Sequence, residues 1–197
     1  MSDDALALAA LFIATMSFTP GPANLSMLSV GASVGLSRAL PYLVGIWLGG
    51  FAVILSGAMG LGALFVSAPA LFIGLKIVGF AYICWLAWKL ARMGFGGKTH
   101  EVAPTFWAGT ALHPVNPKAF VQVGVVFSTF VTQEAAYVPQ ALLLGGFCLV
   151  TMMAATSLWG AGGDAIHRFV LNERVMRATA VLASVLMVAS VGAALLF

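Results

Sequence analysis

Two short, proline-rich stretches with polar residues interrupt long apolar runs. Residues 18–24 read FTPGPAN, and residues 113–118 read HPVNPK. Proline removes a backbone donor and clashes with the preceding turn, so each stretch predicts a break in a helix. At bilayer depth, the N–H and C=O groups freed by a break persist only where they are buried in protein or line a cavity. Two breaks in corresponding positions of two halves indicate a transporter's binding site.

Lys118 is the residue in these stretches best suited to bind a ligand. It lies near the middle of its apolar run, where an insertion scale puts the cost of a lysine at roughly 2.5–3.5 kcal/mol. No Asp or Glu lies inside an expected span to pair with it, unless Asp164 reaches inward. We therefore favour an ammonium that faces a cavity and meets water or an anionic ligand group. Snorkelling, or a bond to the carbonyls freed at Pro114 and Pro117, is the structural alternative.

Two asparagines accompany the breaks, Asn24 after the first and Asn116 within the second. Asparagine is a favoured N-cap, so either residue can cap the half-helix that restarts there, contact a ligand, or do both. The N-terminus of a half-helix also attracts a carboxylate. Gln122 lies one turn beyond Lys118 on the same face, whereas we assign no role to His113. The expected substrate-binding residues are Pro20, Gly21, Pro22, Asn24, Asn116, Pro117, Lys118 and Gln122.

The composition predicts a membrane protein. The chain has 197 residues, of which 61% are hydrophobic and 8% charged, whereas a soluble domain has about 25% charged residues. Several runs exceed the roughly 20 apolar residues that a spanning helix needs, and helices satisfy their own backbone in lipid. We expect one all-α transmembrane domain, residues 1–197, with six transmembrane helices, the first and fourth of them broken. The expected spans are about 5–30, 39–65, 70–92, 105–132, 137–161 and 175–197.

The basic residues predict the orientation, because cytoplasmic loops are enriched in Lys and Arg. One side of the expected bundle receives Arg38, Lys89, Arg92, Lys98, Arg168, Arg174 and Arg177. The other side has Asp3, Asp4 and Glu134 and no basic residue. Both termini are therefore expected in the periplasm. The acidic N-terminus also differs from that of a secretory signal peptide, and the net charge of +3 is too small and dispersed to indicate nucleic-acid binding.

The chain also shows signs of internal duplication. Residues 48–51 and 144–147 both read LGGF, and their spacing nearly equals that of the two proline breaks. Three spans per copy is an odd number, so the second copy enters from the opposite face and forms a 3+3 inverted repeat. We place repeat one at about 5–92, a cytoplasmic linker at 93–104 and repeat two at about 105–197. Glycines four apart, at 31/35 and 45/49, are expected on shared faces where helices approach closely.

The polar residues favour transport of a neutral solute that carries a carboxylate. A pore for a dication or a basic amino acid would need buried carboxylates, and none is evident. No catalytic constellation, metal-ligand spacing or cofactor motif appears, so we do not expect an enzyme. Two alternatives stay open. One is a membrane thiol–disulfide carrier that uses Cys84 and Cys148, and the other is a non-transporting assembly partner. The sequence leaves the oligomeric state open, a homodimer included.

The motifs then resemble a known family. The TPGP of residues 19–22, the glycines at 31, 35, 79 and 109, Tyr82 and the NPKA of residues 116–119 are similar to the LysE/RhtB family of amino-acid exporters. Residues 80–89, 106–108 and 128–131 resemble its cysteine/O-acetylserine branch more closely, because many family members have Pro-Gln in place of Ser128-Thr129. The resemblance implies efflux of amino acids across a bacterial inner membrane, driven by proton motive force. It does not fix the substrate.

Overall fold

The computed structural model describes residues 2–60, 69–93, 104–132, 135–169 and 173–196, and every regular element within these ranges is a helix. The predicted all-α class is therefore confirmed for the described part of the chain. The helices are α1 (Asp3–Phe18), α2 (Pro22–Val34), α3 (Leu36–Ala58), α5 (Pro69–Met93), α6 (Phe106–Leu112), α7 (Pro117–Thr129), α8 (Tyr137–Phe169) and α9 (Glu173–Leu196).

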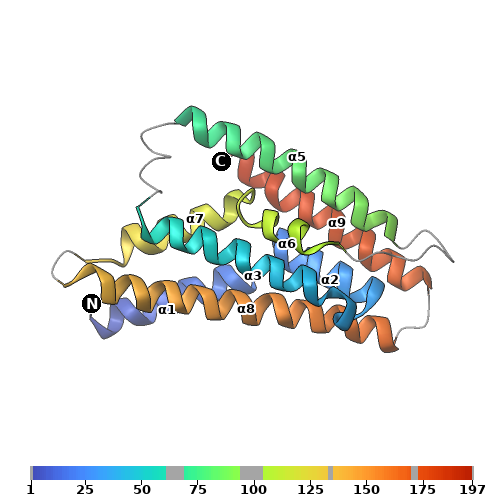
Figure 1. Ribbon diagram of the computed structural model, residues 1–197, viewed down its shortest axis with the longest axis horizontal. Helices are drawn as coiled ribbons and strands as arrows, with labels where there is room; N and C mark the ends of the chain where they lie inside the picture. Colours follow the sequence, from blue (N-terminus) through green and yellow to red (C-terminus); the bar gives the residue numbers. More distant parts are fainter. Residues whose placement is uncertain (1, 61–68, 94–103, 133–134, 170–172, 197) are drawn as a thin grey trace.

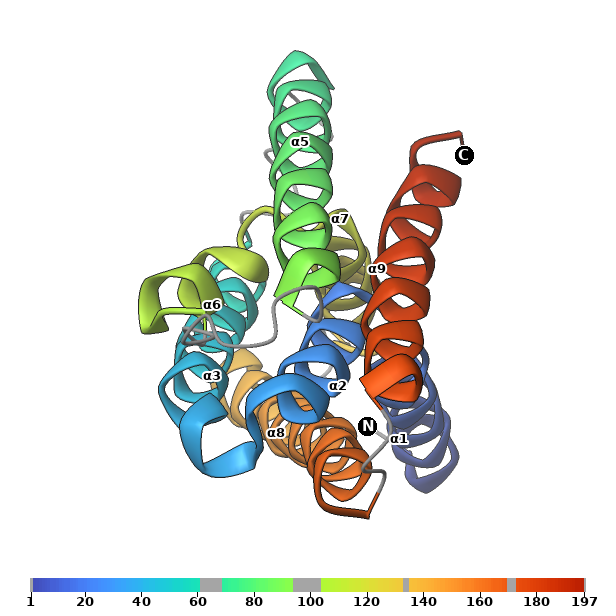
Figure 2. The same cartoon turned by 90° about the vertical axis from the view of Figure 1, so that its right-hand side faces the viewer.

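The helices run back and forth along the long axis of the molecule. In Figure 1, α1 and α2 lead from left to right, α3 returns, and α5 runs to the right again; α6 with α7, α8 and α9 repeat this alternation in the opposite sense. The end-on view in Figure 2 places α2 near the centre, and α2 contacts α3, α5, α8 and α9. The half-helix that follows the first proline break is thus the most enclosed element.

Both proline stretches separate two helices. Helix α1 ends at Phe18, α2 begins at Pro22, and the two axes are bent by 44°. Helix α6 ends at Leu112, and α7 begins at Pro117. A proline at the first position of a helix removes an N–H that would have had no partner there, and its fixed φ suits the helix start. Proline therefore both interrupts the first half-helix and begins the second, at Pro22 in α2 and at Pro117 in α7.

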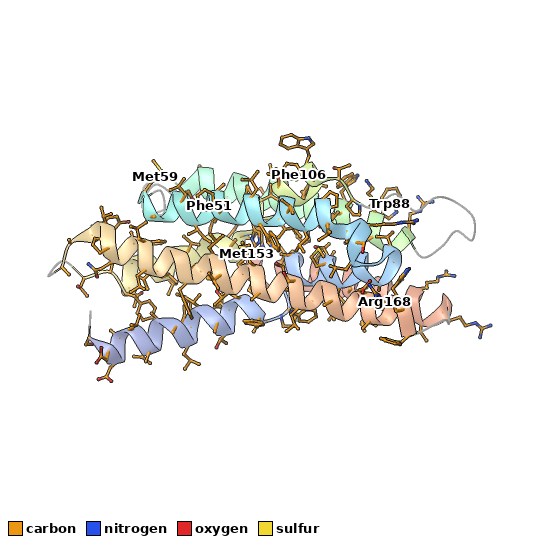
Figure 3. The ribbon with its side chains drawn as sticks, turned by 60° about the horizontal axis from the view of Figure 1, so that its bottom comes forward. Phe51, Met59, Trp88, Phe106, Met153 and Arg168 are labelled. Carbon is orange, nitrogen blue, oxygen red and sulfur yellow. The ribbon has the colours of Figure 1, made fainter. Side chains whose placement is uncertain are left out.

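Length and surface identify a membrane protein. Helices α3 and α8 are each long and apolar enough to cross a bilayer, and α1 with α2 counts as a third span if the bent pair is one span. Large apolar side chains are exposed along these helices, among them Leu48, Phe51, Leu55, Leu142, Val150 and Leu158. So much exposed apolar surface is typical of lipid contact. Trp88 and Arg168 lie at one end of the molecule, and Met59 lies toward the other (Figure 3).

Glycines allow α3 to contact α6, and α2 to contact α8, backbone to backbone. A Cβ on Gly45 would overlap the carbonyl oxygen of Phe106, and a Cβ on Gly109 would overlap that of Tyr42. Gly31 meets α8 in the same way, at the carbonyl oxygen of Gly160. The expectation for residues 31 and 35 was wrong in part: both glycines face α8 near Asp164, but Gly35 has φ +78° and forms the end of α2.

Side chains at the C-terminal end of α8 bind the backbone of the turn between α2 and α3. Asp164 Oδ1 accepts a hydrogen bond from Leu36 N at 2.8 Å, and Asp164 Oδ2 lies 2.7 Å from Arg168 Nε. His167 Nδ1 lies 3.1 Å from the Ala32 carbonyl oxygen, at the end of α2. Asp164 therefore does not reach Lys118. Helix α8 continues to Phe169, beyond the expected end at residue 161, and these contacts lie in the added part.

Asp164→Ala should lower the free energy of unfolding by about 1–2 kcal/mol, because it removes a carboxylate that caps the first turn of α3. Arg168→Ala should cost less than about 0.5 kcal/mol, because its side chain is 62% exposed and such ion pairs contribute little. Thermal unfolding of the purified protein in detergent measures both. Equal losses in the two variants would mean that the ion pair, and not the cap, stabilises this turn.

Candidate functional site

A cavity lies where the two helix breaks meet. Its volume is about 50 Å³, below the roughly 300–1,000 Å³ of typical small-molecule sites, so an amino acid can enter only if the walls move apart. Its walls come from α1, α2, the second break with α7, and α8. The lining residues are Met16, Ser17, Gly21, Pro22, Ala23, Asn24, His113, Asn116, Lys118, Ala119, Gln122, Met152 and Thr156. Lys118 is the one charged residue in this set, and the set contains no carboxylate.

Asn24 binds the carbonyls at the end of α1. Its Nδ2 donates to the carbonyl oxygens of Ser17 at 2.8 Å and Thr19 at 3.0 Å. Of the alternatives for Asn24, capping of the restarted half-helix was wrong, because the N-cap of α2 is Gly21, which has no side chain to accept a bond. The bend at the first break brings those carbonyls over α2, and the buried asparagine satisfies them.

Asn116 does act as an N-cap. Its Oδ1 accepts from Lys118 N at 3.1 Å, and its carbonyl oxygen accepts from Ala119 N at 3.0 Å. The two asparagine side chains therefore have opposite roles in hydrogen bonding: the Asn24 amide N–H groups donate, and the Asn116 amide oxygen accepts.

The same substitution should separate these two roles. Asn24→Asp replaces the donating amide with an acceptor that faces two carbonyl oxygens, so it should lower the free energy of unfolding by about 2 kcal/mol or more. Asn116→Asp keeps an oxygen at an N-cap, where Asp and Asn are nearly equivalent, and should cost less than about 0.5 kcal/mol. Thermal unfolding in detergent provides the comparison. A larger loss for the residue 116 variant would contradict the two assignments.

Lys118 joins the two breaks. Its Nζ donates to the Thr19 hydroxyl at 2.9 Å and lies 3.3 Å from the Thr19 carbonyl oxygen. The expected structural alternative named the carbonyls at Pro114 and Pro117, whereas the observed partner belongs to the first break. Lys118 has no carboxylate partner among the residues that the structure describes. A Cβ on Gly21 would lie 3.1 Å from Nζ, so the glycine leaves room for the ammonium.

A chain of polar side chains continues from this junction along α7 and α8. Gln122 Nε2 donates to Ser17 Oγ at 3.1 Å, and Ser17 Oγ lies 3.1 Å from Thr151 Oγ1. Nearby, Trp159 Nε1 donates to the Phe18 carbonyl oxygen at 3.3 Å. Sequence reasoning missed these serine, threonine and tryptophan residues, because single residues of these types inside apolar runs are no signal of a site.

The structure brings most of the expected site residues together. Gly21, Pro22, Asn24, Asn116, Lys118 and Gln122 all line the cavity. Pro20 and Pro117 do not line it: Pro20 is exposed, and Pro117 is buried at the start of α7. The two cysteines are free thiols and do not line this cavity: Cys84 lies on α5, and Cys148 is buried on α8.

Residues 14–197 match the family model described as LysE type translocator. The chain belongs to the LysE-type translocator family. This family relationship confirms the resemblance seen in the sequence motifs and indicates a transport protein.

Several curated proteins that are similar to this chain share one name. The cysteine/O-acetylserine efflux protein of Salmonella choleraesuis (strain SC-B67) is 36% identical over 117 residues, which cover 59% of this chain and 60% of the relative. The protein of that name from Escherichia coli (strain K12) is 34% identical over 155 residues, or 76% of this chain and 77% of the relative. The chain thus spans about 60% of the length of the Salmonella relative. No solved structure matches this LysE-type chain significantly.

Proposed function

We propose that this protein exports small neutral amino acids from the cytoplasm, and that they bind where the two helix breaks meet. The observation that carries the proposal is the position of Lys118, whose ammonium bridges the breaks beside a cavity and bonds to the oxygens of Thr19. A substrate carboxylate can displace the neutral Thr19 oxygens, because a charge-assisted hydrogen bond is roughly twice as strong as a neutral one.

The other expected residues supply the rest of the site. Helix α2 begins without a side-chain cap, so its N-terminus offers N–H groups and a partial positive charge to an anion. Gln122 and Asn116 face the same cavity and can bind the polar groups of the solute. Pro20, Pro22 and Pro117 act through the backbone, because they create the two helix ends.

Alternating access follows from the 3+3 inverted repeat that we propose, with α1, α2, α3 and α5 in one copy and α6, α7, α8 and α9 in the other. The helix contacts support this pairing. In the proposed repeat, α1, α2 and α3 correspond to α6, α7 and α8. The contact between α2 and α8 then corresponds to that between α7 and α3, and the contact between α3 and α6 corresponds to that between α8 and α1. Two similar copies can then rock against each other around a fixed site.

The charge distribution and the family support a proposed direction of transport and a proposed location. Arg38, Arg92 and Arg168 lie at ends of α3, α5 and α8 that face the proposed cytoplasmic side, and Lys98 and Glu134 lie outside the described residues. We therefore place both termini in the periplasm, the protein in a bacterial inner membrane, and the proton motive force as its driver. Because the relatives are named as cysteine/O-acetylserine efflux proteins, cysteine and O-acetylserine are the first solutes to test.

The alternatives have less support. A thiol–disulfide carrier would need both cysteines near the breaks, whereas only Cys148, on α8, lies near the second break and Cys84 faces a groove between α5 and α9. A Cys84→Ser, Cys148→Ser double variant that keeps full transport would dispose of this alternative. A non-transporting partner has no need for an uncompensated lysine beside a cavity.

Uptake into inside-out vesicles tests the function directly. Vesicles that contain the protein should accumulate labelled cysteine or O-acetylserine when a pH gradient is imposed, and accumulation should fall when the gradient is collapsed. Vesicles without the protein are the control. The absence of uptake for every neutral amino acid tested would overturn the proposal, whereas uptake that ignores the gradient would overturn only the proton coupling.

A further inference from the structure

A second cavity adjoins the first. It is smaller, about 30 Å³, and lies between α3, α7 and α8; its lining adds Gly50, Val53, Ile54, Val123 and Cys148. His113, Ala119, Gln122 and Met152 line both cavities. The second cavity is mainly apolar, so it suits the side chain of a solute better than its charged groups.

Met152 lies at the boundary between the two cavities. A Cβ on Gly50 would overlap the Met152 sulfur and would lie 2.8 Å from its Cε, so the glycine makes room for the thioether. Methionine is unbranched and has three rotatable side-chain bonds, which lets it adapt to what lies beside it. A change of its rotamer can therefore join the two cavities.

His113 provides an unused polar atom at this boundary. Its Nε2 is buried and has no hydrogen-bond partner. The neighbouring ring atom Cδ2 lies 3.2 Å from the position of a Cβ on Gly50, so this edge of the ring faces the second cavity. A buried polar atom without a partner costs stability. Such a group in a cavity wall is a candidate contact for a ligand.

We propose that His113 Nε2 binds the side chain of the transported amino acid, and so selects solutes whose short side chain carries a thiol, hydroxyl or ester group. This inference rests on the proposed export function. Lys118 holds the carboxylate in the first cavity, and the side chain extends past Met152 to His113. A neutral imidazole nitrogen can donate or accept, so it serves a thiol or an ester carbonyl.

Cysteine and 2-aminobutyrate test this selection, because they have nearly the same shape and differ by a thiol in place of a methyl group. In inside-out vesicles, the protein should transport cysteine about tenfold more efficiently than 2-aminobutyrate. In His113→Leu the ratio should fall to about one, through loss of cysteine transport with 2-aminobutyrate transport retained. His113→Gln should restore part of the preference.

The control is Ser29→Ala. The Ser29 hydroxyl is also buried without a partner, but it lies on α2 away from both cavities, so its removal should leave the ratio unchanged. The Tm of His113→Leu should equal or exceed that of the unmodified protein, because the substitution removes an unsatisfied polar atom. An unchanged ratio, an equal loss for both solutes, or a lower Tm would show that His113 is structural or binds water only. Failure of the unmodified protein to transport either solute would instead overturn the export function, and this inference with it.

Discussion

Lys118→Met is expected to reduce the transport of neutral amino acids about 100-fold or more. The ammonium is the one charge in the cavity wall, and removing one partner of a buried charge pair costs about 2–5 kcal/mol of binding. Initial uptake rates in inside-out vesicles, corrected for the amount of protein, measure the effect. The loss should be similar for solutes with different side chains, because every amino acid presents the same carboxylate.

Lys89→Met is the matched control. Lys89 lies exposed on α5 with its Nζ 5.3 Å from the centre of the Trp85 ring, so its removal should leave transport unchanged. The Thr19 oxygens lose a donor in Lys118→Met, and this should lower the free energy of unfolding by only about 1 kcal/mol. Transport that persists in a folded Lys118→Met protein would remove Lys118 from the site.

Gly109→Ala is expected to lower the free energy of unfolding by about 2 kcal/mol or more. A Cβ on Gly109 would overlap the Tyr42 carbonyl oxygen and would lie 3.0 Å from Ile46 N. Both atoms belong to the backbone of α3, so α6 and α3 must move apart, and overpacking of this kind typically costs about 1–3 kcal/mol. The Tm in detergent should fall by roughly 4–8 °C.

Gly146→Ala is the control for this prediction. Gly146 lies in α8, and no atom outside its own stretch of helix lies within 4 Å of the position of its Cβ among the described residues. Alanine is a better helix former than glycine, so the variant should gain up to about 1 kcal/mol. Opposite signs for the two substitutions would support close contact between α3 and α6. A stable Gly109→Ala protein would show that these helices do not pack backbone to backbone.

The prolines made the two helix breaks predictable, because the effect of proline on a helix is local. The cap at Asn116 was predictable for the same reason. The partner of Lys118 was not, since Thr19 and Lys118 come from different halves and a lone threonine is no signal. Of the two alternatives for Asn24, capping was wrong, because N-cap preference says nothing about carbonyls that a 44° bend brings over the helix.

The loop regions show another limit of local reasoning. Asp164 and His167 are polar residues of the kind found in solvated turns, yet they lie within α8 and contact the α2–α3 turn. Gly35 fits a small-residue packing motif as well as it fits a helix end, and only the fold distinguishes the two. Tertiary partners decide these cases, and a single sequence does not contain them.

Binding of an amino acid and of its carboxamide to the purified, unmodified protein tests the central claim most directly. Both ligands have the same side chain and α-amino group, and only the amino acid carries a carboxylate for Lys118. Equilibrium binding in detergent should be at least about tenfold tighter for the amino acid than for the amide. Equal affinities would contradict a carboxylate site at the junction of the two helix breaks.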